Sequence, residues 1–358
     1  MIPGTCDVLV VGAGPAGSVA AHVLASGGLK TVLADSAQAH KPKVGESLPG
    51  AAQAMLQSVG LLPSLIRSRP QTNIGNLSSW GSPRLVATDF ILDPQGCGWH
   101  LDRARFDQCL REAAVQSGAI LCEGRLRALS FGPDGVAATI ADRPIAARWI
   151  VDASGKSRAV ARRVGATRQR DPALIALYAW GKSRHPDTRS VIEAVADGWW
   201  YTAGLPGGGR VAALHTLPAH AADMLKRPDG FALAMSGSMH VKHYCAFDDT
   251  WTAVQSTDAA GSWLGKVHGP GWIAVGDAAL AFDPLSSQGL FNAIYTGLRG
   301  AQALLASLLN ADASQLAQYA IRIQEIRSTY RDQVITYYQQ EQRWHRHPFW
   351  RSRHSEQP

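Results

Sequence analysis

Apolar and polar positions near the start of the chain predict a strand, a helix and a second strand. Residues 8–11 form a continuous apolar run, a glycine-rich turn follows, and residues 32–34 form a second run that ends at Asp35. A strand that is buried on both faces of a sheet has this unbroken apolar pattern. We expect the small apolar residues between the two runs, Ala16 to Ala25, to form the connecting helix.

Two later segments have a related shape, a short apolar strand that stops at an acid and a turn of small residues. They are residues 149–155, with the sequence WIVDASG, and residues 271–279, with the sequence GWIAVGDAA. Elsewhere, apolar and polar residues alternate over 71–101 and 166–266, which is typical of strands in an antiparallel or mixed sheet. We expect these alternating segments to form the part of the protein that binds the substrate.

The last part of the chain has helical spacing of its apolar residues. From residue 301 onward the spacing predicts two long helices, of which 312–341 is amphipathic. The combined pattern predicts an α/β fold: a Rossmann-like dinucleotide-binding domain, an inserted mixed or antiparallel β-sheet substrate domain, and C-terminal helices. The boundaries that we expect are 1–70, 102–165 and 267–310 for the nucleotide-binding domain, 71–101 and 166–266 for the substrate domain, and 311–358 for the C-terminal helical region with its basic tail.

Composition narrows the class of protein further. Hydrophobic residues make up 46% of the chain and charged residues 18%, whereas charged residues make up roughly 25% of an average globular protein. This balance excludes a disordered, fibrous or coiled-coil protein. The five cysteines are odd in number, scattered and without a CxxC pair, which argues against a disulfide framework and a structural zinc site.

Charge and targeting signals indicate a cytoplasmic protein without a nucleic-acid partner. No apolar stretch approaches the roughly 18 residues that a membrane span needs, and the first residues lack the basic start of a signal peptide. The net charge is +7, and much of the excess lies in the tail between Arg343 and His354. We expect this tail to be a solvated terminus, because no recognisable nucleic-acid-binding module accompanies it.

The turn after the first strand carries the clearest chemistry. Residues 12–17 read GAGPAG and match the GxGxxG pattern, in which Gly12 makes the turn, Gly14 lets the backbone approach a pyrophosphate and Gly17 lets the helix pack on the strand. The helix that follows points its N-terminus at the phosphates. Asp35 lies 23 positions after Gly12, where a carboxylate can accept hydrogen bonds from the ribose of an adenosine. This unit alone does not distinguish FAD from NAD.

With the two later segments in place, the chain resembles flavoprotein monooxygenases of the p-hydroxybenzoate-hydroxylase type, a superfamily that includes flavin-dependent halogenases and geranylgeranyl reductases. The superfamily carries GxGxxG, a DG motif in mid-chain and a late GD motif, which correspond here to residues 12–17, Asp152 and Asp277. The segment Arg103–Asp107, RARFD, matches its RxxFD motif. The resemblance implies an FAD-binding domain in which Arg103 reaches toward the ribityl and phosphate part of the flavin, Asp277 holds the ribityl hydroxyls and Asp152 tightens its turn near the cofactor.

The segment after the GD motif is expected to place a helix against the flavin. Residues 286–298, SSQGLFNAIYTGL, are apolar at helical spacing and open with small polar residues. The N-terminus of such a helix would stabilise the anionic pyrimidine edge of reduced flavin. The residues that we expect in this role are Ser287, Gln288, Gly289 and Leu290.

The segment Gly45–Pro49, GESLP, resembles the GES motif of the halogenases, yet residues that halogenation needs are missing. Tryptophan halogenases have a lysine in the segment after the GE pair, and no lysine occurs from Val44 to Leu110. They also have a glutamate at the position that corresponds to Ser286. We therefore expect hydroxylation rather than halogenation.

The resemblance is greatest to the halogenase-like branch that includes peptidyl-tryptophan hydroxylases of cysteine tryptophylquinone biogenesis. It implies an FAD-dependent monooxygenase that hydroxylates an aromatic substrate through a flavin C4a-hydroperoxide, with an aromatic small molecule or a tryptophan within a peptide or protein precursor as the substrate. O2 would supply the oxygen atom, and NAD(P)H would supply the electrons directly or through a separate flavin reductase. The alternatives are a flavin-dependent reductase or oxidase of a prenyl or small-molecule substrate, a non-enzymatic flavoprotein that shields a precursor, and a flavin-dependent halogenase.

The residues expected at the site follow from these motifs. We expect catalytic roles for Glu46, Ser287, Gln288 and Gly289, and substrate contacts from two or three of the aromatic residues, represented by Trp80, Trp199 and Tyr201. The expected cofactor contacts are Gly12, Gly14, Pro15, Ala16, Gly17, Asp35, Ser36, Glu46, Ser47, Arg103, Asp152, Gly276, Asp277, Pro284, Gln288, Gly289 and Leu290. No metal is expected, because a strand through 240–245 would separate His240 from His243 and Cys245. His100, His215 and His220 are candidate proton carriers without a supporting motif.

Overall fold

The computed structural model describes residues 2–36, 42–182, 185–245, 250–310 and 312–355. The expected strand–helix–strand unit is present as β1 (Thr5–Val11), α1 (Pro15–Ser26) and β2 (Thr31–Asp35). Both strands pair in parallel, and residues 8–10 are fully buried because helices cover the sheet on its faces. The unbroken apolar run therefore predicted the environment of β1 correctly.

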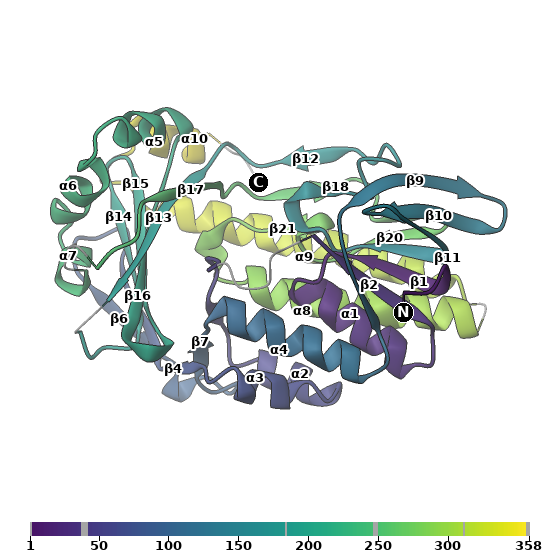
Figure 1. Cartoon of the computed structure of the whole chain (residues 1–358). Coiled ribbons are helices and arrows are strands. Elements are labelled where there is room, and N and C mark those ends of the chain that lie inside the picture. Colours follow the sequence, from purple (N-terminus) through teal and green to yellow (C-terminus); the bar gives the residue numbers. More distant parts are fainter. Residues whose placement is uncertain (1, 37–41, 183–184, 246–249, 311, 356–358) are drawn as a thin grey trace.

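The two later apolar segments join the same sheet, to the right in Figure 1. β11 pairs with β1 on one side and with β20 on the other, and β20, β11, β1, β2 and β8 all run parallel. A hairpin of β9 and β10 pairs with the start of β11. The strands that complete this sheet are β8 (Ile120–Glu123), β9 (Leu126–Gly132), β10 (Gly135–Ile140), β11 (Arg143–Asp152), β19 (His268–Gly269) and β20 (Trp272–Ala274).

Helices pack on this sheet and on one another. α1 lies against α4 (Arg103–Gln116) and α8 (Gly289–Leu309). The crossing of α1 and α8 is close because α8 presents Gly297, where an added Cβ would lie 2.4 Å from the carbonyl oxygen of Ala16. The short helices α2 (Ala52–Ser58) and α3 (Leu62–Arg67) share an apolar cluster with α4 and α8.

A second, seven-stranded sheet stands to the left in Figure 1, in the order β17-β13-β16-β15-β14-β5-β6. β14 and β5 pair in parallel and the other neighbours are antiparallel, so the expected mixed sheet is confirmed. Its strands are β5 (Gly75–Ser79), β6 (Val86–Asp89), β13 (Ile175–Lys182), β14 (Ser190–Val195), β15 (Gly198–Leu205), β16 (Gly209–Thr216) and β17 (Gln255–Asp258). Two three-stranded sheets lie between the large ones, formed by β3 (Ser47–Leu48), β7 (Gly98–His100) and β4 (Gln71–Asn73), and by β12 (Arg168–Arg170), β18 (Ser262–Leu264) and β21 (Leu280–Ala281).

The expectation that 166–266 is entirely strand is wrong for its middle part. α5 (Pro218–Leu225), α6 (Gly230–Ser236) and α7 (Val241–Tyr244) cover the outer face of the seven-stranded sheet. That face is apolar, with Trp200 packed edge-on against Phe231 of α6. The segment 240–245 is not a strand, because α7 occupies most of it. Its histidines and cysteine therefore do not alternate between the faces of a sheet.

The two expected C-terminal helices are α8 and α9 (Ser314–Gln340), and a further short helix, α10 (Pro348–His354), follows them. α9 contributes to both large cores. Tyr319 and Ile323 near its start pack in the core of the parallel sheet, whereas Tyr330 and Tyr338 near its end pack against the inner face of the seven-stranded sheet. α9 therefore ties the two sheets together.

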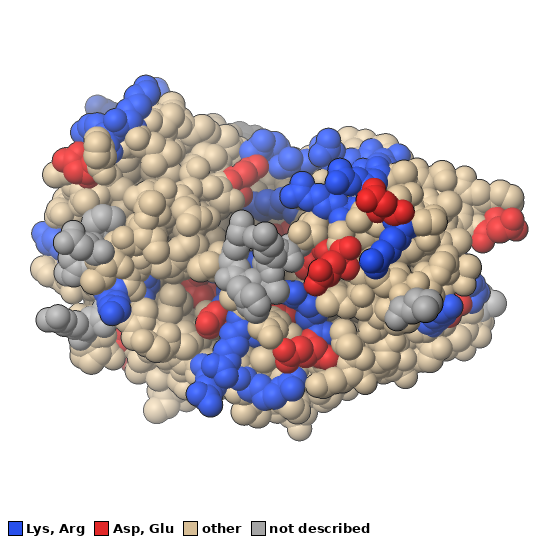
Figure 2. Space-filling view, in the orientation of Figure 1, with Lys and Arg blue, Asp and Glu red and all other residues tan. Residues whose placement is uncertain are grey.

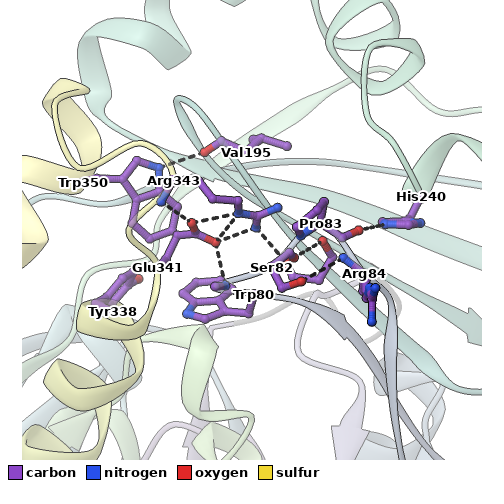
Figure 3. A network of polar contacts seen from close by, with 12 residues as sticks. Trp80, Ser82, Pro83, Arg84, Val195, His240, Tyr338, Glu341, Arg343 and Trp350 are labelled. Atoms are coloured by element: carbon purple, nitrogen blue, oxygen red, sulfur yellow. Dashed lines mark hydrogen bonds and ion pairs between the residues drawn. The ribbon is translucent and has the colours of Figure 1, made fainter.

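The basic tail is packed on the molecule, which corrects the expectation of a solvated terminus. Figure 3 shows Glu341, which is fully buried and accepts hydrogen bonds from the backbone of Gly81 and from the Arg343 guanidinium. Trp350 is also fully buried, and its indole Nε1 donates to the carbonyl oxygen of Val195 at 2.9 Å. Burial of these aromatic and charged groups anchors the tail to the seven-stranded sheet.

Figure 2 shows Lys and Arg side chains gathered near the middle of the visible side of the molecule, with Asp and Glu side chains among them. The positive charge is therefore not confined to the C-terminal tail.

All five cysteines are free thiols. Within the described ranges, no group of three or more His, Cys, Asp or Glu side chains is arranged to hold a metal ion. None of the described helices has both the length and the apolar character that crossing a membrane requires.

Candidate functional site

A cavity of about 410 Å³ lies where the glycine turn, the GES loop and the inner face of the seven-stranded sheet meet. One wall comes from residues 14–16, residues 44–47 and the turn that precedes α8. The opposite wall comes from β13, β15, β16 and β17. A ligand in the cavity would therefore contact both large sheets.

The glycine turn between β1 and α1 has the close packing that its sequence requires. Gly12 has a φ of +105°, and an added Cβ would lie 2.4 Å from the carbonyl oxygen of Ala153. At Gly17 an added Cβ would lie 1.8 Å from the carbonyl oxygen of Gly12. Gly14 differs, because nothing lies within 4 Å of its added Cβ and the residue lines the cavity. Gly12 and Gly17 thus form the turn, and Gly14 leaves its cavity side open.

The first turn of α1 is available to an anion. Gly14 is its N-cap residue, no side chain caps the helix and no acidic residue occurs in its first turn. Pro15 and Ala16 also line the cavity. Backbone N–H groups at a helix N-terminus bind phosphate when no side chain competes for them.

Asp35 lies beside this turn. The backbone N–H of Gly12 donates to the carbonyl oxygen of Ala34 at 2.7 Å, which brings the end of β2 against the start of the turn. Asp35 is the last residue of β2, and Ser36 follows it as an exposed residue. Neither residue lines the cavity, so both belong to the sheet edge next to it.

Asp152 stabilises its own turn rather than lining the cavity. It is fully buried at the end of β11, and one carboxylate oxygen accepts hydrogen bonds from the backbone N–H groups of Val160 and Ala161 at 2.9 and 2.8 Å. The other oxygen accepts from the backbone and hydroxyl of Ser154. The carboxylate therefore fixes the segment that presents Ala153, Gly155 and Lys156 to the cavity.

Three charged side chains line the cavity near the GD motif: Asp277, Arg103 and Lys156. Burial raises the pKa of Asp277, and the nearby Lys156, Arg103 and Arg158 oppose this rise. Arg103 is held by the carboxylate of Asp107 at 3.1 Å and donates to the carbonyl oxygen of Gly45 at 2.9 Å. Two cations and one carboxylate therefore lie near the GD motif, and the acids Glu46, Asp258 and Asp283 also line the cavity.

Gly276 positions Asp277. Its φ is +61°, and an added Cβ would lie 2.7 Å from the side chain of Ala16. Its backbone N–H donates to the hydroxyl of Thr296 in α8 at 2.8 Å. Gly276 thus packs the GD turn against α1 and α8 and does not itself line the cavity.

Glu46 is a buried acid on the cavity wall. Its carboxylate accepts a hydrogen bond from the backbone N–H of Gly45 at 3.0 Å, and 3% of the residue is exposed. Burial raises the pKa of Glu46, while the Tyr201 hydroxyl, the loop backbone and Arg103 act in the opposite direction. Ser47 follows in β3 and also lines the cavity. A carboxyl group with a raised pKa keeps its proton to a higher pH than an ordinary glutamate does, which suits a role in proton transfer.

The turn before α8 differs slightly from its expected form. Asp283 caps the turn by accepting a hydrogen bond from the backbone N–H of Leu285. Ser287 has a left-handed backbone conformation with a φ of +51°. α8 begins at Gly289 rather than at Ser286. The residues of this turn that line the cavity are Asp283, Pro284, Ser287, Gly289 and Leu290. Gln288 lines a separate pocket on the other side of α8, so the structure does not bring it to the cavity.

The substrate wall is one face of the seven-stranded sheet. Trp199 and Tyr201 of β15 both line the cavity. Trp199 lies stacked on His215 of β16, with ring centroids 3.7 Å apart, and burial lowers the pKa of His215 to about 3. His215 is therefore neutral near pH 7, which makes it a poor proton carrier.

The structure does not bring Trp80 to the cavity. Its indole Nε1 donates to the carbonyl oxygen of Tyr337 at 2.7 Å, and its ring packs edge-on against Trp350. Figure 3 shows Trp80 beside Glu341 and Tyr338, within the contacts that anchor the C-terminal segment. His100 and His220 also lie outside the cavity lining.

Sequence reasoning missed Lys156 and Tyr178. Lys156 lines the cavity, and its Nζ donates to the carbonyl oxygens of Asp258 and Ala260 at 2.8 and 3.0 Å. The signal that could have found it is its position directly after the DASG turn. Tyr178 could have been found from its spacing on β13, two residues after the cavity-lining Ala176.

The residues of the cavity fit FAD. The uncapped N-terminus of α1 and the open space at Gly14 suit a pyrophosphate, and Arg103 and Lys156 supply positive charge nearby. The carboxylate of Asp277 has no hydrogen-bond partner within the described ranges and suits sugar-type hydroxyls. These groups match the phosphate, hydroxyl and ring parts of a flavin dinucleotide.

Comparison with known proteins gives consistent results. The model of the tryptophan halogenase family matches residues 83–358. LodB of Marinomonas mediterranea, which is named as an FAD-dependent oxidoreductase, is 26% identical over 98% of this chain and 97% of its own length.

Solved structures superpose on nearly the whole chain. The myxobacterial chondrochloren halogenase CndH has a TM-score of 0.87 at 24% identity, covering 98% of this chain and 86% of that chain. The peptidyl tryptophan dihydroxylase QhpG, described as essential for tryptophylquinone cofactor biogenesis, has a TM-score of 0.80 at 25% identity, covering 98% and 78%. The fold is thus that of the FAD-dependent halogenases, with a Rossmann-like domain.

Proposed function

The chain belongs to the tryptophan halogenase family and is an FAD-dependent oxidoreductase, and from this premise we propose that it is a monooxygenase that hydroxylates an aromatic substrate. The observation that supports the proposal is the shared cavity. The nucleotide-type turn, the buried acid Glu46 and the aromatic sheet face all line it. Cofactor and substrate would therefore meet within one partly apolar cavity, which limits the access of water that oxygen transfer must avoid.

The substrate that we favour is a tryptophan within a peptide or protein precursor. Two observations support it: the likeness to QhpG over 98% of this chain, and a cavity wall that carries Trp199, Tyr201 and Tyr178. An aromatic small molecule is the other candidate for the same wall. O2 supplies the oxygen atom, and NAD(P)H supplies two electrons directly or through a flavin reductase.

FAD, when bound, would supply the two-electron activation of O2. The chain's own residues would bind and orient the partners. The turn at Gly14 and the charged groups Arg103 and Asp277 would hold the cofactor, and the sheet face would exclude water from the substrate ring. Glu46 would accept the proton that the ring carbon loses when the new C–O bond has formed. The overall balance is one aromatic C–H, O2, NAD(P)H and H⁺ giving one aromatic C–OH, water and NAD(P)⁺.

One observation favours halogenation as a second candidate. The segment after the GE pair has no lysine, but Lys156 reaches the cavity from the DASG turn. Two backbone carbonyl oxygens hold its amine, and burial lowers the pKa of that amine. An amine in this position could receive an oxidised halogen. We rank hydroxylation first because Lys156 lies beside Asp277, where its charge also suits the cofactor.

Isotope tracing tests the proposal. Purified protein reconstituted with FAD is supplied with NAD(P)H, a flavin reductase, labelled O2 and a tryptophan-containing peptide, with and without bromide. We expect one labelled oxygen atom in the product by mass spectrometry. The variant Glu112→Gln changes an exposed acid of α4 and serves as the control for effects of expression and purification.

Each other outcome has a defined meaning. A brominated product that disappears in Lys156→Met would replace hydroxylation by halogenation. Turnover without label in the product would favour the reductase or oxidase of a prenyl or small-molecule substrate. Protein that cannot be reconstituted with FAD would contradict the cofactor assignment itself.

A further inference from the structure

The register of the seven-stranded sheet places two tyrosines on either side of an alanine. Ala213 of β16 lies directly opposite Tyr178 of β13 and directly opposite Tyr201 of β15. All three residues line the cavity, so their side chains share one face of the sheet. We call this row of three residues the tyrosine row.

The neighbouring row shows what a large central residue does. There His215 lies between Ala176 and Trp199, and the imidazole fills the space by stacking on the indole at 3.7 Å. In the tyrosine row the central residue is alanine, which has only a methyl group. The alanine therefore has no side chain that could fill the space between the two tyrosines as His215 fills the neighbouring row.

The dimensions of this space suit a flat ring. Neighbouring strands lie about 4.8 Å apart, so the strands that carry Tyr178 and Tyr201 are separated by about 10 Å. A ring stacked between two others needs about 7–8 Å, since carbon atoms in contact lie about 3.5–4.0 Å apart. A planar aromatic group therefore fits within this width.

The two tyrosines have different surroundings. The Tyr178 hydroxyl donates to the side-chain oxygen of Gln255 at 3.4 Å, and its ring packs edge-on against Trp180 at 5.1 Å. The Tyr201 hydroxyl is buried next to Glu46 of the GES loop, which raises the pKa of the tyrosine together with burial. The Tyr201 side of the row is therefore the side nearest Glu46.

We propose that Ala213 determines substrate specificity by keeping a slot open between Tyr178 and Tyr201 for a flat aromatic group such as the indole of tryptophan. This inference rests on the proposed function, because it assigns the substrate class of the same cavity. The slot selects planar rings over isoprenoid chains. It also presents the ring beside Glu46, where the proton is released.

Binding measurements on the FAD-loaded protein test the slot without turnover. The probes are N-acetyl-tryptophanamide as the planar ligand and geraniol as the aliphatic one, titrated by calorimetry. Wild type is expected to bind the indole compound more tightly than geraniol. Ala213→Leu is expected to weaken indole binding about tenfold or more, because the larger side chain occupies the slot.

Matched variants guard against indirect effects. Ala137→Leu makes the same substitution at an exposed position of β10 and is expected to change neither ligand's affinity. The flavin content of Ala213→Leu is expected to equal that of wild type, which shows that the fold persists. If that variant does not fold, Ala213→Gly takes its place, and it is expected to bind a methyl-substituted indole more tightly than wild type does.

The results separate this inference from the proposed function. Wild-type indole affinity in a flavin-loaded Ala213→Leu protein, or no gain in Ala213→Gly, would overturn the slot. Tighter binding of geraniol than of the indole compound by wild type would overturn it as well. A normal binding pattern without labelled oxygen in the product would leave the slot standing and overturn hydroxylation.

Discussion

Single residues around the cavity carry charge in a place that water reaches poorly. Glu46 and Asp277 have pKa values raised by burial, and Lys156 has a pKa lowered by burial. Each shift disfavours the charged form, so each group is closer to exchanging a proton at neutral pH than the same group in water. Shifts of this kind at the wall of a cavity are characteristic of reactive sites.

The proton-accepting role of Glu46 can be tested by Glu46→Gln. The amide keeps the size of the side chain but cannot accept a proton, so we expect the turnover rate to fall about a hundredfold or more, with little change in flavin content or KM. In wild type the rate should rise with pH as Glu46 ionises, above the ordinary range of a glutamate because burial raises its pKa. The variant should lose that limb of the pH–rate profile. An unchanged profile would mean that another group takes the proton.

His215 should make stability depend on pH. Burial lowers its pKa from 6.5 to about 3, so between those values the unfolded chain binds a proton that the folded chain does not. The free energy of unfolding should therefore fall as the pH falls from 6.5, by at most about 1.4 kcal/mol per pH unit from this group. Urea unfolding at pH 7.5, 6.0 and 5.0 measures the slope.

The variant His215→Gln isolates that contribution. Buried acids such as Glu46 and Asp283, whose pKa values are raised, oppose the histidine by binding protons in the folded state. They are present in both proteins, so the difference between the two slopes reports His215 alone. Equal slopes in both proteins would show that the imidazole is protonated to the same degree in the folded and unfolded chains.

At the level of elements, a buried chain of hydrogen bonds links the substrate wall to the turn before α8. The indole Nε1 of Trp199 donates to the Tyr338 hydroxyl at 3.2 Å, and that hydroxyl donates to the carboxylate of Asp283 at 2.9 Å. Trp199 belongs to β15, Tyr338 to α9, and Asp283 caps the turn that leads into α8. α9 thus connects the two walls of the cavity and fixes their relative position.

The substitution Tyr338→Phe tests this link. It leaves the buried indole N–H of Trp199 and one carboxylate oxygen of Asp283 without their partner, so we expect a loss of about 1–3 kcal/mol in the free energy of unfolding. It should also weaken binding of the indole ligand while flavin content is retained, since Trp199 is no longer tied to Asp283. Tyr337→Phe removes the hydroxyl from the adjacent, largely exposed tyrosine and is the matched control. Equal ligand affinity in both variants would reduce Tyr338 to a purely structural role.

Elements with one dominant local signal could be predicted from sequence, and those set by distant partners could not. β1, α1 and β2 follow from apolar runs and from Gly12 and Gly17, whose close contacts leave no room for a side chain. α5 to α7 were expected as strands because short helices that cover a sheet carry apolar residues at intervals that also suit strands. The docked tail was missed because the burial of Trp350 depends on the far-off β14.

The residues of the candidate site divide in the same way, into those that a local motif predicts and those whose position depends on distant segments. Gly14 and Asp277 lie in motifs whose spacing fixes their place in the fold, and both line the cavity. Trp80 was grouped with the pocket because it is aromatic and lies in the substrate part, but sequence does not tell which face of a strand meets the cavity. Lys156 and Tyr178 have local signals in their position and spacing, but which strand face and which turn meet the cavity depends on the pairing of distant segments.

On the scale of the whole molecule, the cavity exists only when both large sheets are folded. Its lining comes from segments between Gly14 and Ala293, and α9 packs its first half on one core and its second half on the other. The two sheets also share the cavity, to which both contribute lining residues. A ligand that fills the cavity should therefore stabilise the molecule as a unit.

Flavin binding should raise the thermal stability of the entire chain. A ligand that binds only the folded state at about 100 times its Kd adds about 2.7 kcal/mol, and we expect the Tm in differential scanning calorimetry to rise by several degrees with FAD while unfolding stays a single transition. Asp277→Asn keeps the shape of the GD turn but removes the carboxylate charge, so its rise should be smaller at the same FAD concentration. AMP is the matched ligand, because it offers the adenosine half without the flavin, and it should raise the Tm less. Two separate transitions, of which FAD moves only one, would show that the parallel sheet binds FAD without the seven-stranded sheet.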